Sequence, residues 1–222
     1  MSQVLDTPVR KRASKKAKVE TAAPLIPANP SYETLRKAAA RCTACPLWKR
    51  GTQTVFGEGS LKAKIIFVGE QPGNEEDLAG HPFIGPAGKV LDRGLEEAGI
   101  DRTQCYVTNA VKHFNWEPAG KRRIHKKPNS KEIAACRPWL DAEIALLKPK
   151  IVVCLGATAA QALLGPKFKV TDRHGELIET NSGFHVMATV HPSSILRIPD
   201  EETRHRERER FTDDLRKLKK LL

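Results

Sequence analysis

The chain has 222 residues, enough for one domain with tails, and its hydrophobic fraction of 40% is enough for a buried core. Its formal net charge is +12, of which +4 falls in residues 1–20, so the rest of the chain is also basic. This balance favours a polyanionic partner, with simple solubility as the alternative. No apolar run approaches the roughly 18 residues of a membrane helix, which argues against a membrane partner.

The chemistry expected of the cysteines depends on the cellular compartment. The first residues lack an apolar secretory segment, so a cytoplasmic, reducing location is expected. An odd number of cysteines with one Cys-x-x-Cys pair then favours metal or redox chemistry over disulfides. The five cysteines are Cys42, Cys45, Cys105, Cys136 and Cys154.

Strands and helices are expected to alternate along the chain. Residues 1–28 are polar, basic and proline-bearing, which predicts a disordered tail before a domain at residues 29–222. Ser31 is suited to cap the first helix. The alternation predicts an α/β domain with a mostly parallel sheet covered on both faces. Strands are expected at residues 64–69, 105–111, 150–156 and 185–190, and helices at residues 32–41, 86–98, 130–147, 157–164 and 201–221.

Four polar segments leave the carboxyl ends of the expected strands, where sheets of this kind bind ligands. They are residues 69–73, the stretch from Asn109 through residues 121–127, residues 156–158, and residues 191–194. Residues 121–127 carry five permanent cations and one histidine. This basic loop is either a solvated charge run or a phosphate-binding loop that delivers His125 to a reacting centre.

Residues 69–73 match neither a dinucleotide fingerprint nor a P-loop. Their two glycines and one proline predict a turn that aims Glu70 and Gln71 into the crevice, unless Glu70 is only a surface residue. Phe83, in a proline-flanked loop, is either a core anchor or a stacking platform for a planar base.

The segment after the last strand carries a second histidine. His191 can stabilise a developing anion, while Ser193 and Arg197 can hold phosphate. A capped turn without a function is the alternative.

A metal site is indicated by the Cys42-x2-Cys45 pair. A zinc ion or an iron–sulfur cluster needs four ligands, and Cys136 follows in a later helix. His113, just past a strand end, is better placed as the fourth ligand than Cys154, which lies in an apolar strand-like run.

Together, these motifs resemble those of the uracil-DNA glycosylase superfamily. They follow one another along the chain in the same order as in its iron–sulfur family 4. Gln71 and the insertion Lys-Arg-Arg-Ile-His at residues 121–125 resemble the UdgX type within it. The motifs are Cys42-x2-Cys45, Val55-Phe56-Gly57-Glu58-Gly59, Gly69-Glu70-Gln71-Pro72-Gly73, Pro82-Phe83-Ile84-Gly85, Thr108-Asn109, Leu155-Gly156-Ala157 and His191-Pro192-Ser193.

The resemblance implies a three-layer α/β/α sandwich with a central four-stranded parallel sheet. It also implies a structural [4Fe-4S] cluster on Cys42, Cys45, His113 and Cys136. Family 4 has a cysteine at the position of His113, so this chain departs from the four-cysteine pattern there.

A base-excision mechanism is also implied. Uracil would be flipped out of the strand and into the crevice. Phe83 would stack on the base, Asn109 would read its Watson–Crick edge, and His191 would stabilise the departing uracil anion. Glu70 would offset the positive charge of the oxocarbenium-like sugar.

In UdgX-like proteins the inserted histidine then attacks the sugar, and His125 matches that residue. Attack requires a neutral imidazole, a form that the surrounding cations favour, and Glu70 would accept the displaced proton. Gln71 would position the loop or the base. Phosphate or loop-holding contacts are expected from Lys112, Arg123 and Ser193.

The expected partner is uracil-containing DNA, single-stranded first and double-stranded also, bound by a monomer that is nucleoid-associated when on DNA. One alternative is an ordinary turnover glycosylase in which the loop only grips DNA. Another is a non-catalytic, metal-stabilised nucleic-acid-binding module. A nucleotide-dependent small-molecule enzyme is disfavoured because a phosphate-cradle motif is missing.

Overall fold

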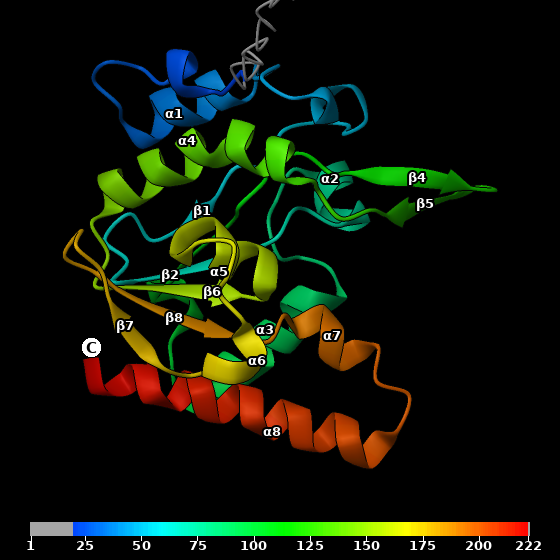
Figure 1. The fold of residues 1–222 in the computed structure, drawn as a ribbon, viewed down its shortest axis with the longest axis vertical. Helices are drawn as coiled ribbons and strands as arrows, with labels where there is room; N and C mark the ends of the chain where they lie inside the picture. Colours follow the sequence, from blue (N-terminus) through cyan, green and yellow to red (C-terminus); the bar gives the residue numbers. More distant parts are fainter. Residues whose placement is uncertain (1–19, 222) are drawn as a thin grey trace, which may run out of the picture.

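The computed structural model describes residues 20–221 and contains a central six-stranded sheet (Figure 1). Its strand order is β1-β3-β2-β6-β8-β7. The inner four strands run parallel, and the two outer strands pair antiparallel with their neighbours. The strands are β1 (Glu58–Gly59), β2 (Ile65–Gly69), β3 (Tyr106–Asn109), β6 (Ile151–Leu155), β7 (Leu177–Glu179) and β8 (His185–Thr189).

The four parallel strands confirm the expected centre of the sheet. Every residue of β2, β3 and β6 is buried, which explains why their sequences are continuous apolar runs. The short edge strands β1 and β7 were not predicted. Each has few residues and an exposed face, so neither produces a clear pattern.

Helices cover both faces of the sheet (Figure 1). Ile65 and Phe67 of β2 point into a core shared with α3 (Pro86–Ala98) and α8 (Glu201–Lys217). The alternate residues Ile66 and Val68 point into a second core shared with α4 (Ser130–Leu147) and α5 (Ala157–Leu164). This arrangement is the expected three-layer α/β/α sandwich.

An outer layer packs α1 (Tyr32–Ala39) onto α4 around a third hydrophobic cluster. Ala22 is fully buried in this cluster, and its N–H donates to the carbonyl of Ala135 at 2.9 Å. Ala22 thus packs on the domain, although it lies in residues 1–28, the stretch that the sequence predicts to be a disordered tail. The remainder of that tail, residues 1–19, lies outside the described residues.

The helix ends follow local chemistry. The Ser31 hydroxyl accepts a hydrogen bond from Thr34 N–H and caps α1, and left-handed Gly99 (φ 65°) ends α3. None of the helices in residues 20–221 has the length and apolar character needed to cross a membrane. The shorter elements are η1 (Ala23–Leu25), η2 (Pro46–Lys49), α2 (Asn74–Ala79), η3 (Arg102–Gln104), α6 (Val170–Arg173), α7 (Pro192–Leu196) and η4 (Leu218–Leu221).

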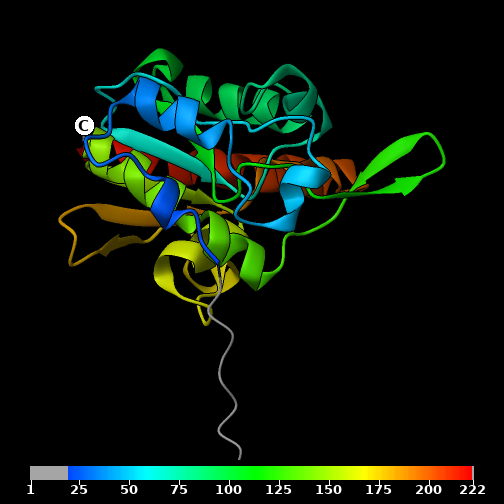
Figure 2. The same ribbon diagram turned by 90° about the horizontal axis from the view of Figure 1, so that it is seen from above.

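The basic stretch is a β-hairpin, where the sequence predicted a loop. Strands β4 (Trp116–Ala119) and β5 (Arg122–His125) pair antiparallel, and Gly120 (φ 60°) supplies the left-handed position in the turn. The hairpin extends away from the body of the molecule in both views (Figures 1 and 2). Its strands are largely exposed on both faces, so no alternating hydrophobic pattern marks them in the sequence.

Candidate active site

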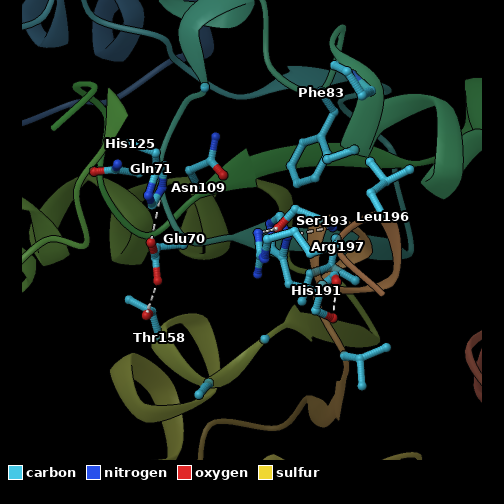
Figure 3. Close-up of a pocket in the computed structure, with 18 of the residues that line it drawn as sticks. Glu70, Gln71, Phe83, Asn109, His125, Thr158, His191, Ser193, Leu196 and Arg197 are labelled. Atoms are coloured by element: carbon cyan, nitrogen blue, oxygen red, sulfur yellow. Dashed lines mark hydrogen bonds and ion pairs between the residues drawn. The ribbon is translucent and has the colours of Figure 1, made fainter. Parts of the chain in front are cut away.

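A cavity of about 1000 Å³ lies at the carboxyl ends of the parallel strands (Figure 3). Glu70 follows β2, Asn109 ends β3, and His191 follows β8, and all three line this cavity. Phe83 and His125 also lie on its wall, and so do Gln71, Ser193 and Arg197. The structure thus brings together groups that lie as far apart as residues 70 and 191.

Phe83 and Asn109 form one side of the cavity. The Phe83 ring is 7% exposed and stacks against the His191 ring, with centroids 6.4 Å apart. A Cβ atom added at Gly69 would lie 2.3 Å from Asn109 Oδ1 and 2.7 Å from Phe83 Cζ. The glycine at the end of β2 therefore provides the space in which the amide and the ring meet.

The backbone of Phe83 is held in an uncommon conformation. Its φ of 57° lies in the left-handed region, which costs free energy for a residue with a side chain. A Cβ atom at Gly88 in α3 would lie 1.8 Å from the Phe83 carbonyl oxygen. Close packing on Gly88 holds the loop in place and presents the ring to the cavity.

His191 is fixed as one neutral tautomer. Its Nδ1 accepts a hydrogen bond from Ser193 N–H at 3.1 Å and lies 2.8 Å from Ser193 Oγ. Burial lowers the pKa of His191 to about 4, which leaves the ring neutral near pH 7 with its proton on Nε2. Because the residue lines the cavity, this N–H is available to donate to a ligand there.

Ser193 also lines the cavity, and its hydroxyl is engaged by the histidine that it orients. Arg197 Nη1 donates to Ser193 Oγ at 3.0 Å, which directs the serine hydroxyl hydrogen towards His191. The three residues form a short chain at the start and end of α7.

Glu70 joins two elements across the cavity (Figure 3). Its Oε1 lies 3.3 Å from His125 Nε2, and its Oε2 accepts a hydrogen bond from the Thr158 hydroxyl. Burial alone would raise the pKa of Glu70, but the hydrogen bonds from His125 and Thr158 outweigh burial and the pKa is lowered. The carboxylate is therefore ionised beside the imidazole.

Sequence reasoning assigns no role to Thr158, although it places residues 156–158 at the carboxyl end of a strand. The hydroxyl in this segment is the only feature of the sequence that could have pointed to the residue. What could not be seen from sequence is that it meets the carboxylate of residue 70, which lies 88 positions earlier.

Gln71 lines the cavity, and its side-chain amide is engaged by the residues at the foot of the hairpin. Its Nε2 donates to the carbonyls of Asn115 and Lys126, both at 3.1 Å, and its Oε1 accepts from Asn115 N–H at 3.1 Å. Gln71 is only 7% exposed. Of the two roles expected for it, the contacts favour positioning the hairpin.

Arg123 also fixes the hairpin to the body. Its Nη1 lies 2.6 Å from the fully buried Asp77, and its Nε donates to Asn74 Oδ1 at 2.7 Å. Lys126 pairs with Glu117 at 3.0 Å. These two cations are engaged by carboxylates, so they do not surround His125 as free charges.

Lys112 does not line the cavity, which contradicts the expected phosphate contact. Its side chain is 1% exposed and lies 2.5 Å from Glu143 Oε2, while its Nζ also donates to the Asn109 carbonyl at 2.8 Å. Removing this ammonium from water requires the partner carboxylate, and that carboxylate lies on α4, 31 residues later. Lys112 holds the end of β3 from behind.

Comparisons with known proteins agree with this geometry. Residues 56–216, more than half of the chain, match the family model described as the uracil DNA glycosylase superfamily. The chain belongs to the uracil-DNA glycosylase superfamily. A type-4 uracil-DNA glycosylase from Thermotoga maritima is 41% identical over 173 residues, covering 78% of this chain and 86% of the relative.

Other members of the superfamily are similar over comparable lengths. A type-4 uracil-DNA glycosylase from Archaeoglobus fulgidus is 33% identical over 198 residues, covering 86% of this chain and 93% of the relative. A type-5 uracil-DNA glycosylase from Thermus thermophilus is 30% identical over 192 residues, with 79% and 82% covered.

Three of the four expected metal ligands of this superfamily member share one buried cluster. Cys42, Cys45 and Cys136 are each less than 9% exposed and belong to the cluster between α1 and α4. Cys42 Sγ accepts from Trp139 Nε1 at 3.3 Å, and Cys136 Sγ accepts from Lys112 N–H at 3.2 Å. Buried thiols with N–H donors suit a soft metal centre.

The two candidates for the fourth ligand are placed differently. Cys154 lies within β6 in the core between the sheet and α4, away from the other cysteines. His113 is buried outside that core, and burial lowers its pKa to about 4, which keeps the ring in its neutral, metal-binding form. Among residues 20–221, no three candidate ligands stand together at metal-binding spacing.

Proposed function

We propose that this protein is a uracil-DNA glycosylase that excises uracil from DNA and becomes covalently linked to the abasic site through His125. The observation that carries the covalent step is the 3.3 Å approach of His125 Nε2 to Glu70 Oε1 on the cavity wall. A nucleophile, an ionised acceptor and an orienting donor are the parts that nucleophilic catalysis requires. The type-4 relatives support the excision step.

The base would be held between Phe83 and Asn109. The aromatic ring offers a stacking surface worth roughly 1–3 kcal/mol. The Asn109 side-chain amide makes no hydrogen bond to other described residues, so both its donor and its acceptor remain for the Watson–Crick edge of uracil. Flipping the base into the cavity costs a few kcal/mol, which these contacts offset.

His191 would assist departure of the base. As the N-glycosidic bond breaks, its electron pair moves to uracil, and the neutral Nε2–H donates to the developing anion. The ionised Glu70 lies on the same cavity and stabilises positive charge on the sugar.

His125 then completes the reaction. A ring nitrogen bonds to C1′ of the oxocarbenium-like sugar, and the single N–H proton of the neutral imidazole passes to Glu70. The products are a neutral alkylated imidazole, a protonated carboxyl group and the uracil anion, so atoms and charge balance, and the anion then takes a proton from water. His125 is half-exposed, so strand DNA can reach it.

A structural [4Fe-4S] cluster is part of the proposal. Cys42, Cys45, Cys136 and His113 would hold it, joining the segment after α1 to α4. Its chemistry would be to bind these ligands, without taking part in base excision. The buried thiols and their N–H donors support this assignment.

Uracil-containing DNA, single-stranded or double-stranded, is the proposed substrate, and the protein is proposed to act as a monomer. The decisive experiment incubates protein with uracil-containing single-stranded DNA and resolves the products on a denaturing gel. A slower-migrating protein–DNA band is expected, with no more than one event per protein molecule. The matched variant His125→Ala should lose this band and release free abasic product.

An ordinary turnover glycosylase predicts the opposite pattern. The unaltered protein would then convert many substrate molecules without a shifted band, and His125→Ala would behave like it. A binding module without catalysis would release no uracil from either protein.

A further inference from the structure

The two oxygens of the Glu70 carboxylate have different partners. Oε1 faces His125 Nε2 at 3.3 Å, and Oε2 accepts a hydrogen bond from the Thr158 hydroxyl. Within residues 20–221 no third side chain donates to this carboxylate. Each oxygen is therefore assigned to one partner, and the rotation of the carboxylate is determined by both contacts together.

Thr158 is well placed to act as the fixed end of this chain. It is 3% exposed and is the second residue of α5, whose start is anchored directly after β6. His125, in contrast, is half-exposed and lies on the projecting hairpin. The threonine hydroxyl is thus the enclosed contact and the imidazole the exposed one.

The covalent step changes only one of the two contacts. When His125 bonds to C1′, its hydrogen bond to Oε1 is replaced by transfer of its proton to that oxygen. The bond from Thr158 to Oε2 takes no part in the transfer and persists throughout. Of the two side chains that hydrogen-bond to Glu70, His125 belongs to the reacting pair, and Thr158 is the donor that stays outside it.

We infer that Thr158 is a positioning residue for the covalent step, whose hydroxyl holds Glu70 so that Oε1 receives the proton of His125. The inference rests on the proposed function. Thr158 is then a third member beside His125 and Glu70. A proton acceptor that another group already orients costs less free energy to hold in the reactive geometry.

Two substitutions at this position separate the hydroxyl from the shape of the side chain. Thr158→Val keeps the shape and removes the donor, and Thr158→Ser keeps the donor. A hydrogen bond to a charged group is worth about 1.5–3 kcal/mol, so the valine variant should form the adduct roughly 10–150-fold more slowly. The serine variant should remain close to the unaltered protein.

The pH profile provides a readout that general loosening would not move. Without the Thr158 hydrogen bond, burial of Glu70 is less well offset and its pKa rises. The acidic midpoint of the adduct-formation rate should therefore move to higher pH in Thr158→Val and stay in place in Thr158→Ser.

Thr212→Val is a matched control. Thr212 is also buried and donates to a carboxylate, Glu97 Oε2, at 3.2 Å, but it does not line the cavity. This control should retain both the adduct rate and the pH midpoint. Melting temperatures of all three variants identify any that fail to fold.

The outcomes distinguish the two proposals. If the unaltered protein forms no adduct, the proposed function fails. If it forms the adduct but Thr158→Val keeps the same rate and pH midpoint, the role of Thr158 is overturned. Equal impairment of the serine and valine variants would also overturn it, because the hydroxyl would then be irrelevant.

Discussion

His191 illustrates how one side chain is tuned by its neighbours. Its Nδ1 is occupied by Ser193, so the neutral ring has a single donor, Nε2–H. Burial is the largest influence and lowers the pKa of His191 from an ordinary 6.5 to about 4, although the nearby charge of Glu70 opposes the change. A neutral donor near pH 7 binds a developing anion without first attracting phosphate or water as a cation would.

The lowered pKa has a consequence for stability. Between pH 6.5 and about 4 the unfolded chain binds a proton at this residue and the folded protein does not. The free energy of unfolding is therefore fully retained above pH 6.5 and falls as the pH drops through that range, by at most about 1.4 kcal/mol per pH unit. In His191→Gln the free energy of unfolding, measured with urea at several pH values, should depend less steeply on pH. An unchanged dependence on pH would contradict this account.

The β4–β5 hairpin carries His125, so in the proposed mechanism it serves the covalent step and not base excision. Gln71 attaches its base through three hydrogen bonds, and Arg123 attaches β5 to Asp77 and Asn74. Phe83, Asn109 and His191 lie on other elements. Loosening the hairpin should therefore impair the adduct more than the release of uracil.

Substituting Gln71 by Leu tests this separation. The change removes all three hydrogen bonds and leaves the Asn115 N–H without its partner, which costs about 1–3 kcal/mol. Adduct formation should slow roughly 5–100-fold while uracil release changes little, as measured by quantifying shifted DNA and free uracil in one reaction. Lys126→Ala, which loses only an exposed ion pair, is the control. Equal loss of both products in Gln71→Leu would contradict the separation.

Burial explains which helices and strands could be predicted from the sequence and which could not. The inner strands and long helices were found because one or both faces are buried, as in β2 and α3. The hairpin was missed because both its faces meet solvent. Lys112 is predicted from sequence to make a phosphate or loop-holding contact, because nothing in the sequence links it to Glu143. The ion pair with Glu143 is what compensates for the burial of its ammonium group.

At the scale of the whole molecule, the outer layer depends on the cysteine cluster. Short segments around Cys42 and Cys45 have little regular structure, and their thiols pack against Cys136 and Trp139 of α4. A bound cluster would stabilise the folded state because its ligands are brought together only on folding.

Cysteine substitutions test this dependence. Cys136→Ala should abolish the broad visible absorbance of an iron–sulfur protein and lower the melting temperature. Cys154→Ala, in a different core, should keep the absorbance, while His113→Ala should lose it if His113 is the fourth ligand. Retention of colour in His113→Ala together with its loss in Cys154→Ala would reverse that assignment. If the protein is colourless and contains stoichiometric zinc, the metal site is a zinc site and the iron–sulfur assignment is overturned.

The attachment of the hairpin uses main-chain atoms at residues 115 and 126. Main-chain groups are the same whatever side chain a residue carries, so the three hydrogen bonds of Gln71 place no demand on the side chains at residues 115 and 126. The attachment through Arg123, in contrast, depends on its guanidinium. His125, the proposed nucleophile, is thereby carried on an insert whose attachments are separate from Phe83, Asn109 and His191, the residues proposed to handle the base. A graft of this hairpin into a turnover glycosylase would need residues 115–127, a glutamine at position 71, and the Asp77 and Asn74 partners of Arg123.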